Sequence, residues 1–250
     1  YNPQNQRLTL FGAACDLVVA GRTVEAGGSA TILLRSRGRS FAALGGSPRE
    51  VRVPTNLLGD TAAMNVAAAF AGALALLDRA ASPEELSRLT AALAAVEAVP
   101  GRLRPLAAGG VFVLDDTYNS NPRSVRAALA AAREVAERRD ARLVVALGDM
   151  LELGAVSPSE HLAMVEAADR CGADQLILVG AETASAVAAR PKELRTPSLL
   201  FPDSAAAAAA VAGAVRPGDL LLVKGSRGMR MERLIAALAG DPPADALPPQ

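Results

Sequence analysis

The 250-residue sequence has few aromatic, cysteine and histidine side chains and no net charge. Aromatic residues make up 3% of the chain and none is tryptophan, so it offers little of the stacking surface that single-strand nucleic-acid binders use. Lys plus Arg and Asp plus Glu each total 26, so the chain lacks the basic excess that binds nucleic-acid phosphates or anionic lipid. We therefore do not expect nucleic acid as a partner.

The two cysteines, Cys15 and Cys171, are far apart and have neither a second thiol nor a histidine nearby. This spacing argues against a disulfide framework or a zinc site and favours buried free thiols. Apolar runs end well before the roughly 18 residues of a membrane span, and the opening YNPQNQR lacks the apolar core of a signal peptide. The sequence predicts no membrane span, no secretion and a cytoplasmic location.

Several catalytic and nucleotide-binding patterns are absent. The sequence contains no Gly-x-Gly-x-x-Gly fingerprint, no Gly-x-x-x-x-Gly-Lys-[Ser/Thr] P-loop and no Gly-x-Ser-x-Gly elbow. Its one histidine, His161, falls in the first turn of a predicted helix, a position more typical of a helix-surface residue than of a general base. A dinucleotide fold, a P-loop of the chain's own and a hydrolase triad are therefore not supported.

Hydrophobic residues make up 51% of the chain, enough for a sizeable core, and the pattern changes near Val99–Arg102. Before this boundary we predict an antiparallel meander followed by two helices, the second opened by Ser82 as cap and Pro83 in its first turn. The predicted strands are Arg7–Phe11, Asp16–Ala20, Ala30–Arg35 and Ser40–Leu44, and the predicted helices are Thr61–Leu77 and Pro83–Val96.

After the boundary, five nearly all-apolar runs alternate with helical segments, which predicts a mostly parallel, doubly wound α/β sheet covered on both faces. Asn121, a capping box at Ser157–Glu160, and Asp203 mark helix starts. The last helix is expected at Met229–Leu238, before a disordered tail at 241–250. The predicted strands are Val111–Leu114, Leu143–Leu147, Leu176–Val179, Leu199–Phe201 and Leu220–Val223.

Polar clusters follow three of these strands: Asp115–Asn121, Gly148–Glu152 and Lys224–Gly228. Ligands of open parallel sheets bind beyond the carboxyl ends of the strands, so we expect the three clusters to form one binding edge. The remaining strand ends, Gly180–Glu182 and Pro202–Asp203, look like ordinary turns.

Chemically, paired carboxylates at this edge suit ribose hydroxyls, and a Lys-Gly-Ser-Arg run at a helix start suits an anion. A purely structural alternative stays open. In that alternative Asp116, Asn119 and Asn121 only cap a helix and turn, while Lys224 and Arg227 are solvated.

The motifs DDTYNSNP at 115–122, GDMLELG at 148–154 and KGSRGMRME at 224–232, with His161 between them, resemble the C-terminal domain of the Mur ligase family. VPGR at 99–102 resembles the family's junction between central and C-terminal domains. Residues 59–69 resemble its Gly-x-His-Asn-x-x-Asn-Ala-x-Ala-Ala element, although Asp60-Thr61-Ala62 replaces the usual Arg-His-Asn. The resemblance covers roughly residues 7 to 239, and within the family it is to the ligases that add D-alanyl-D-alanine to a UDP-linked tripeptide.

The resemblance implies an ATP- and Mg²⁺-dependent amide ligase of peptidoglycan precursor synthesis, whose partners are UDP-N-acetylmuramoyl-tripeptide (UDP-MurNAc-tripeptide) and D-alanyl-D-alanine. In such ligases ATP phosphorylates the terminal carboxylate of the tripeptide, and the amine of the dipeptide attacks the acyl phosphate. By family position, the nucleotide-binding candidates are Asn65, Arg102, Asp115, Asp116, Tyr118, Asn119 and Asn121. The substrate-binding candidates are Asp149, Met150, Glu152, Lys224, Ser226 and Arg227.

The resemblance also divides the chain into the C-terminal part of a central ATP-binding domain at 1–100, a Rossmann-like C-terminal domain at 101–240 and the tail. The family's P-loop, catalytic glutamate, carbamylated lysine and UDP-sugar domain belong ahead of this sequence, so no catalytic residue or metal ligand is assigned here. We expect a ligase fragment, inactive alone, whose missing segments belong to the same protein or to a partner chain. The alternatives are a non-catalytic nucleotide- or peptide-binding module and an unrelated doubly wound domain of another transferase.

Overall fold

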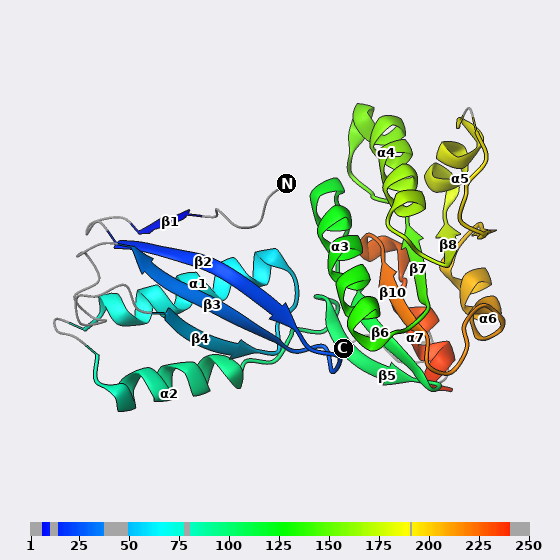
Figure 1. Cartoon of the computed structure of the whole chain (residues 1–250). Coiled ribbons are helices and arrows are strands. Elements are labelled where there is room, and N and C mark those ends of the chain that lie inside the picture. Colours follow the sequence, from blue (N-terminus) through cyan, green and yellow to red (C-terminus); the bar gives the residue numbers. More distant parts are fainter. Residues whose placement is uncertain (1–6, 11–14, 38–49, 78–80, 191, 241–250) are drawn as a thin grey trace, which may run out of the picture. The chain divides into compact units, whose positions relative to one another are not determined.

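A computed structural model describes residues 7–10, 15–37, 50–77, 81–190 and 192–240. The chain divides into two compact units, Tyr1–Glu97 and Ala98–Gln250, a division that falls just before the boundary expected at the Pro-Gly pair. Each unit has its own sheet (Figure 1).

The first unit is an antiparallel sheet of four strands in the order β1-β2-β3-β4, with two helices packed against it (Figure 1). Leu17, Ile32, Leu34 and Val53 from the strands pack against Phe70 and its neighbours, because alternate strand residues point to the same face of the sheet. The elements are β1 (Arg7–Leu10), β2 (Cys15–Val24), β3 (Ala30–Arg37), β4 (Glu50–Thr55), α1 (Asp60–Ala75) and α2 (Pro83–Ala94).

Three of the four strands predicted in this unit are found, and β4 was not predicted. The expected strand at Ser40–Leu44 lies outside the described residues. The predicted start of α2 is confirmed: Ser82 accepts a hydrogen bond from the Glu85 amide and Glu85 reaches back to the Ser82 amide. This reciprocal pair satisfies two amides that a helix start leaves without partners.

The second unit holds a six-stranded sheet in the order β5-β6-β10-β7-β8-β9, with β5 antiparallel and all other pairs parallel. The predicted mostly parallel, doubly wound α/β fold is confirmed. The strands are β5 (Arg104–Ala108), β6 (Val111–Asp116), β7 (Leu143–Gly148), β8 (Gln175–Val179), β9 (Ser198–Phe201) and β10 (Leu220–Lys224).

Helices cover both faces of this sheet. Helices α6 and α7 pack together on one face, whereas α3 and α4 pack together on the other and α5 follows α4 (Figure 1). The helices are α3 (Pro122–Arg139), α4 (Ser157–Arg170), α5 (Ala181–Ala188), α6 (Ser204–Ala214) and α7 (Glu232–Ala239), with short 3-10 turns η3 (Gly154–Val156) and η4 (Arg227–Met229). None of the described helices has the length and hydropathy of a bilayer-crossing segment.

The last strand, β10, lies between β6 and β7 although it follows them by more than 70 residues. Its register places Lys224 beside Asp116 of β6 on one side and beside Leu147 of β7 on the other. Three strands that carry polar clusters are therefore neighbours, with their carboxyl ends at one edge, as expected.

Several local predictions need correction. The hairpin strand β5 was missed, because its Arg-Pro-Leu-Ala-Ala sequence lacks a clear strand pattern. The capping box expected at Ser157–Glu160 is wrong: α4 begins at Ser157 itself, after η3, and has no side-chain cap. The last helix begins at Glu232, because a 3-10 turn and the left-handed Arg230 come before it. The tail at 241–250 lies outside the described residues.

Candidate functional site

Lys224 and Asp116 form the centre of the strand-end cluster. The Lys224 Nζ donates to Asp116 Oδ2 at 2.7 Å and to the backbone carbonyl of Asn119 at 2.8 Å. Asp116 Oδ1 accepts from the Leu103 amide at 3.1 Å, so both carboxylate oxygens have partners within the chain. The Lys224 side chain is only 1% exposed, which contradicts the structural alternative in which it was solvated.

Burial lowers the pKa of Lys224, because the charged ammonium loses its hydration. The charge of Asp116 and its hydrogen bond oppose this shift, and the nearby guanidinium of Arg102 adds to it. A buried, paired lysine of this kind fixes the positions of its partners more than it attracts an ion from solvent.

A second group of contacts joins the start of the unit to the end of β6. Asp115 accepts from the Gly101 amide at 2.9 Å and from the hydroxyl and amide of Thr117. The Tyr118 amide donates to the Gly101 carbonyl at 3.0 Å. The exposed Arg102 guanidinium lies 4.1 Å from the centre of the half-exposed Tyr118 ring, a cation–π contact at the surface.

Ser226 ties all three loops together. Its hydroxyl accepts from the Leu151 amide at 2.8 Å and lies 3.4 Å from the Ser120 carbonyl, and its own amide donates to the Asp149 carbonyl at 3.1 Å. A serine hydroxyl carries one proton, and here that proton points to another loop of the same site. Ser226 therefore joins the loops after β6, β7 and β10.

Asp149 caps helix α5. Its carboxylate accepts from the Glu182 amide and from the amide and hydroxyl of Thr183, at 3.2, 2.8 and 2.6 Å. A negative charge at a helix start is favourable because free amides and the helix dipole face it. The expectation that Gly180–Glu182 is an ordinary turn is wrong, because this turn is bound to the end of β7.

His161 is fully buried, so its prediction as a helix-surface residue is also wrong. Its Nε2 accepts from the Met150 amide at 2.9 Å, and its Nδ1 lies 2.8 Å from the Ser157 carbonyl and 3.1 Å from the Ser157 hydroxyl. The ring contacts Ser157 and lies 3.9 Å from Asp149, yet a backbone amide occupies the nitrogen that a base would use. The Ser-His-Asp grouping is thus not a hydrolase triad.

Three of the four non-glycine residues with positive φ in the described part of the chain lie at or next to the same edge, and the fourth, Asp140, ends α3. Leu103, Glu152 and Arg230 all have φ in the left-handed region, at 52°, 66° and 52°, and each lies in a segment that contacts or continues a strand-end loop. Non-glycine residues adopt this conformation at a cost of about 1–3 kcal/mol and do so more often at functional sites.

The predicted site residues of this unit fall into two groups by exposure. Those that are buried and bonded within the chain, or packed, are Asp115, Asp116, Asp149, Met150, Lys224 and Ser226. Those whose side chains are exposed at the edge are Arg102, Tyr118, Asn119, Asn121, Glu152 and Arg227. Among the latter, Asn121 accepts from the Ser124 amide as the predicted cap of α3, and Arg227 lies 3.5 Å from Glu232.

The remaining candidate, Asn65, is exposed on α1 and belongs to the first unit, whereas the strand-end edge belongs to the second. Sequence reasoning missed Gly101, Leu103 and Thr183, which bind the buried carboxylates. For Leu103 and Thr183 the sequence gives no signal, whereas Gly101 stands in the Pro-Gly pair that marked the boundary.

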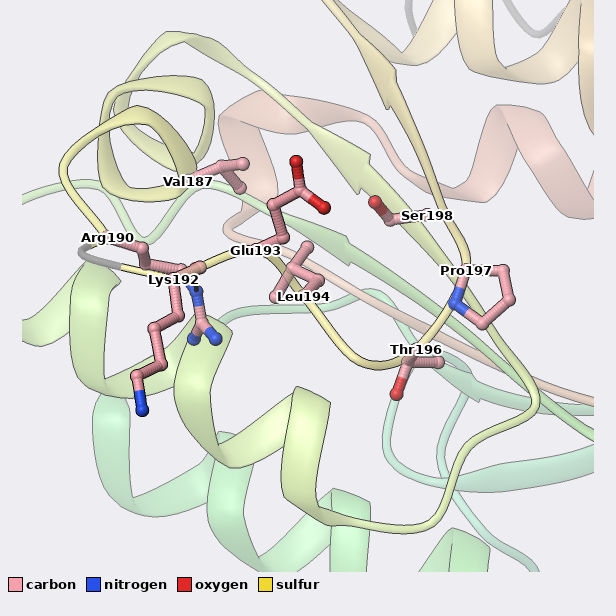
Figure 2. A pocket seen from close by; sticks show the side chains of 8 residues that line it. All are labelled: Val187, Arg190, Lys192, Glu193, Leu194, Thr196, Pro197 and Ser198. Atoms are coloured by element: carbon pink, nitrogen blue, oxygen red, sulfur yellow. Dashed lines mark hydrogen bonds between the residues drawn. The ribbon is translucent and has the colours of Figure 1, made fainter.

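A pocket of about 480 Å³ lies between the end of α5 and the start of β9, at the opposite edge of the sheet (Figure 2). Its buried polar groups already have partners: Arg190 binds Asp169 at 3.0 Å, and Asp169 also accepts from the Arg195 and Thr196 amides. Figure 2 shows the Lys192 side chain pointing away from Ser198. The polar groups around this pocket therefore hold the end of α5 and the segment before β9 together.

The described residues also include no group of three or more His, Cys, Asp or Glu side chains placed to hold a metal ion. The three buried carboxylates at the strand-end edge are bound to amides, to two threonine hydroxyls and to a lysine; they belong to Asp115, Asp116 and Asp149.

Comparison with known proteins shows which family has this domain. Residues 101–227 match the family model described as Mur ligase, glutamate ligase domain, and this match covers half of the chain. The chain belongs to the Mur ligase family. The matched region holds the whole strand-end edge, from Gly101 to Arg227.

Relatives within the family include two ligases of different specificity. The UDP-N-acetylmuramoyl-tripeptide–D-alanyl-D-alanine ligase of Escherichia coli (strain K12) is 35% identical over 182 residues, 70% of this chain and 36% of the relative. The UDP-N-acetylmuramate–L-alanine ligase of Mycobacterium sp. (strain JLS) is 32% identical over 248 residues, 93% of this chain and 47% of the relative.

A solved structure shows the same fold. MurF from Acinetobacter baumannii superposes with a TM-score of 0.69 at 26% identity, covering 90% of this chain and 45% of MurF. The chain therefore spans between about a third and half of the length of these Mur ligases.

Proposed function

We propose that this chain is the C-terminal part of an ATP-dependent amide ligase that adds D-alanyl-D-alanine to UDP-MurNAc-tripeptide during peptidoglycan precursor synthesis. The supporting observation is the single edge formed after β6, β7 and β10, where Lys224, Asp116 and Ser226 fix three loops with the motifs of this ligase group. We expect the reaction in the cytoplasm.

In this proposal residues 1–100 are the end of the central ATP-binding domain and residues 101–240 are the C-terminal domain. The P-loop and the catalytic groups come from other segments of the protein or from a partner chain, since the sequence contains no Gly-x-x-x-x-Gly-Lys-[Ser/Thr]. Mg²⁺ would be held mainly by those segments and by the phosphates, because the described residues offer no cluster of ligands for it.

The buried and exposed groups have separate roles. The exposed Arg102 and Tyr118 fit a nucleotide: the guanidinium suits a phosphate, and the aromatic ring that it covers fixes its direction. Asp115 and Asp116 hold the backbone that carries these two side chains. ATP, when bound, supplies the phosphoryl group that activates the substrate carboxylate.

Asn119, Asn121, Glu152 and Arg227 are the other exposed groups that we assign to ligand contact at this edge, with Glu152 and Arg227 facing the tripeptide or dipeptide. Asp149, Met150, Lys224 and Ser226 contribute by fixing the loops that carry them. Asn65 is assigned to the adenine side through its place in the family element on α1.

The experiment measures Mg²⁺-dependent phosphate release from ATP with UDP-MurNAc-tripeptide and D-alanyl-D-alanine. The chain is assayed alone and after joining to the N-terminal and P-loop segments of a Mur ligase. We expect no release by the chain alone and substrate-dependent release by the joined protein. Release that depends on UDP-N-acetylmuramate and L-alanine instead would assign the other specificity found among the relatives.

The nucleotide assignment is tested by ADP binding to the joined protein. Arg102→Ala should weaken binding about tenfold or more, since a charge-assisted hydrogen bond is worth about 1.5–3 kcal/mol. Arg126→Ala, a change in an exposed residue of α3, is the matched control. Unchanged ADP binding by the Arg102 variant would remove Arg102 from the nucleotide site, and binding of ADP without any turnover would favour the non-catalytic module.

A further inference from the structure

The turn after β7 is held at two successive backbone amides by side chains from elsewhere in the unit. The Met150 amide donates to His161 Nε2 at 2.9 Å, and the Leu151 amide donates to Ser226 Oγ at 2.8 Å. The next residue, Glu152, has φ 66°, so the chain reverses immediately after these two bonds. Leu151 and Glu152 are both exposed at the end of this reversal.

The contacts of His161 fix which nitrogen carries the proton. A backbone amide can only donate, so Nε2, which faces the Met150 amide, must present its lone pair. A backbone carbonyl can only accept, so Nδ1, which faces the Ser157 carbonyl at 2.8 Å, must carry the hydrogen. The geometry therefore selects the neutral Nδ1–H tautomer of the imidazole.

Complete burial makes these two bonds necessary. The His161 ring has no exposed surface, so no water can replace the Met150 or Ser157 contact without opening the packing. An unmade hydrogen bond inside a protein costs the desolvation of the group that lost its partner. One rigid ring thus sets the distance between the first turn of α4 and the end of β7.

We propose that His161 is a positioning residue that, as the Nδ1–H tautomer, holds the Met150 amide and so orients Leu151 and Glu152 toward the substrate. The substrate part of this inference rests on the proposed function. The alternative for a buried histidine is a packing role, which another side chain of similar volume would fill as well.

Nitrogen NMR of the imidazole tests the tautomer directly. His161 is the single histidine of the sequence, so a long-range proton–nitrogen correlation reports it without competing signals. At about pH 7.5 we expect a protonated Nδ1 and an unprotonated Nε2. An Nε2–H tautomer or an imidazolium at this pH would overturn the inference, and this measurement needs no variant.

Two substitutions separate the two bonds of the ring. Gln in His161→Gln is long enough to place an acceptor near the position of Nε2, whereas Asn in His161→Asn reaches only the position of Nδ1. We expect amide hydrogen exchange at Met150 to become about tenfold faster in His161→Asn and to stay within about threefold of wild type in His161→Gln. Equal exchange rates in the two variants, fast or slow, would indicate a packing role and overturn the inference.

Ser157→Ala is the matched control. This change removes the hydroxyl that donates to Glu182 Oε2 and lies 3.1 Å from Nδ1, but it keeps the Ser157 carbonyl that binds Nδ1 at 2.8 Å. Exchange at Met150 should stay at the wild-type rate. Faster amide exchange at Met150 in this variant would show that the Ser157 hydroxyl, and not His161, holds the turn.

A ligand titration links the turn to the substrate. The titration uses the chain joined to the N-terminal and P-loop segments of a Mur ligase. With UDP-MurNAc-tripeptide or D-alanyl-D-alanine added, the amide resonances of Leu151 and Glu152 should shift in the wild type and in His161→Gln, and shift less in His161→Asn. If the wild-type turn responds to neither compound while the tautomer and exchange results hold, the proposed substrate is wrong and the positioning of the turn by His161 stands.

Discussion

The Lys224 ammonium and the Asp116 carboxylate, 108 residues apart in sequence, are bonded at 2.7 Å because β10 lies directly beside β6 in the sheet. The Lys224 side chain is 1% exposed and that of Asp116 is 13% exposed. The pair also holds the Asn119 carbonyl and the Leu103 amide, so two buried charges join the loop after β6 to the segment that precedes β5.

Lys224→Met should destabilise the second unit by about 3–5 kcal/mol, because it leaves the Asp116 carboxylate buried without its partner. Urea unfolding followed by far-ultraviolet circular dichroism measures the change. Arg227→Met, three residues further along the chain and mostly exposed, should change the free energy of unfolding by less than about 0.5 kcal/mol. Equal effects of the two changes would contradict the role of the buried pair.

Gly101→Ala should displace Tyr118. Gly101 has φ 73°, and a Cβ at this position would lie 2.8 Å from the Tyr118 nitrogen, closer than van der Waals contact allows. We expect a loss of about 1–3 kcal/mol in stability and an altered Tyr118 ring resonance in NMR, since Arg102 stacks on this ring.

Gly213→Ala is the control for that change, because Gly213 lies in α6 and a Cβ added there would meet no atom within 4 Å. This variant should be as stable as wild type or more stable by up to about 1 kcal/mol. If the Tyr118 ring resonance shifted equally in both variants, Gly101 would not be what sets the position of the ring.

Ser226→Ala should loosen all three strand-end loops. The change removes the acceptor of the Leu151 amide, a partly buried bond whose loss costs about 0.5–1.5 kcal/mol. Hydrogen exchange at Leu151 should accelerate, whereas Ser159→Ala, which removes an exposed hydroxyl on α4, should leave it unchanged. Unchanged exchange at Leu151 in Ser226→Ala would show that the loops are held by other contacts.

Asp169 should make stability depend on acid pH. Burial alone raises the pKa of its carboxyl. Four contacts lower this pKa by more than burial raises it, so the net shift is downward: the Thr196 amide, the Arg195 amide, the Thr196 hydroxyl and the charge of Arg190. A folded-state pKa below the unfolded one gives stability that is present above the unfolded pKa and is lost as pH falls through the folded pKa.

Asp169→Asn should therefore be less stable than wild type at neutral pH, and the difference should shrink as the pH falls below about 4. Urea unfolding across this range measures it. A difference that stays constant down to the lowest pH would show that the charge of Asp169 is not what stabilises the bond to Arg190.

Much of the second unit could be predicted from the order of its residues. Five apolar runs alternate with helical segments, and such runs become parallel strands because each must be covered on both faces. Caps such as Asn121 and Asp203 act within one helical turn, so they too were predictable and are confirmed. The polar clusters after three strands predicted the edge itself, because the carboxyl ends of parallel strands must meet there.

The less regular segments were harder to predict. Strand β5 is defined by its pairing with β6, and the start of α4 is defined by the contacts of Ser157 with His161 and Glu182. Such elements depend on partners far away in the sequence, which local propensity does not contain.

By itself the sequence determined the α/β architecture, the two-unit organisation and the motifs of the Mur ligase family, since these depend on hydrophobic periodicity and local spacing. Only the tertiary structure decided that β10 lies between β6 and β7, and hence that Lys224 binds Asp116. It also decided which polar residues are buried as supports and which remain exposed. The sequence around a polar residue does not show whether its side chain is buried or exposed, because burial depends on everything that packs around it.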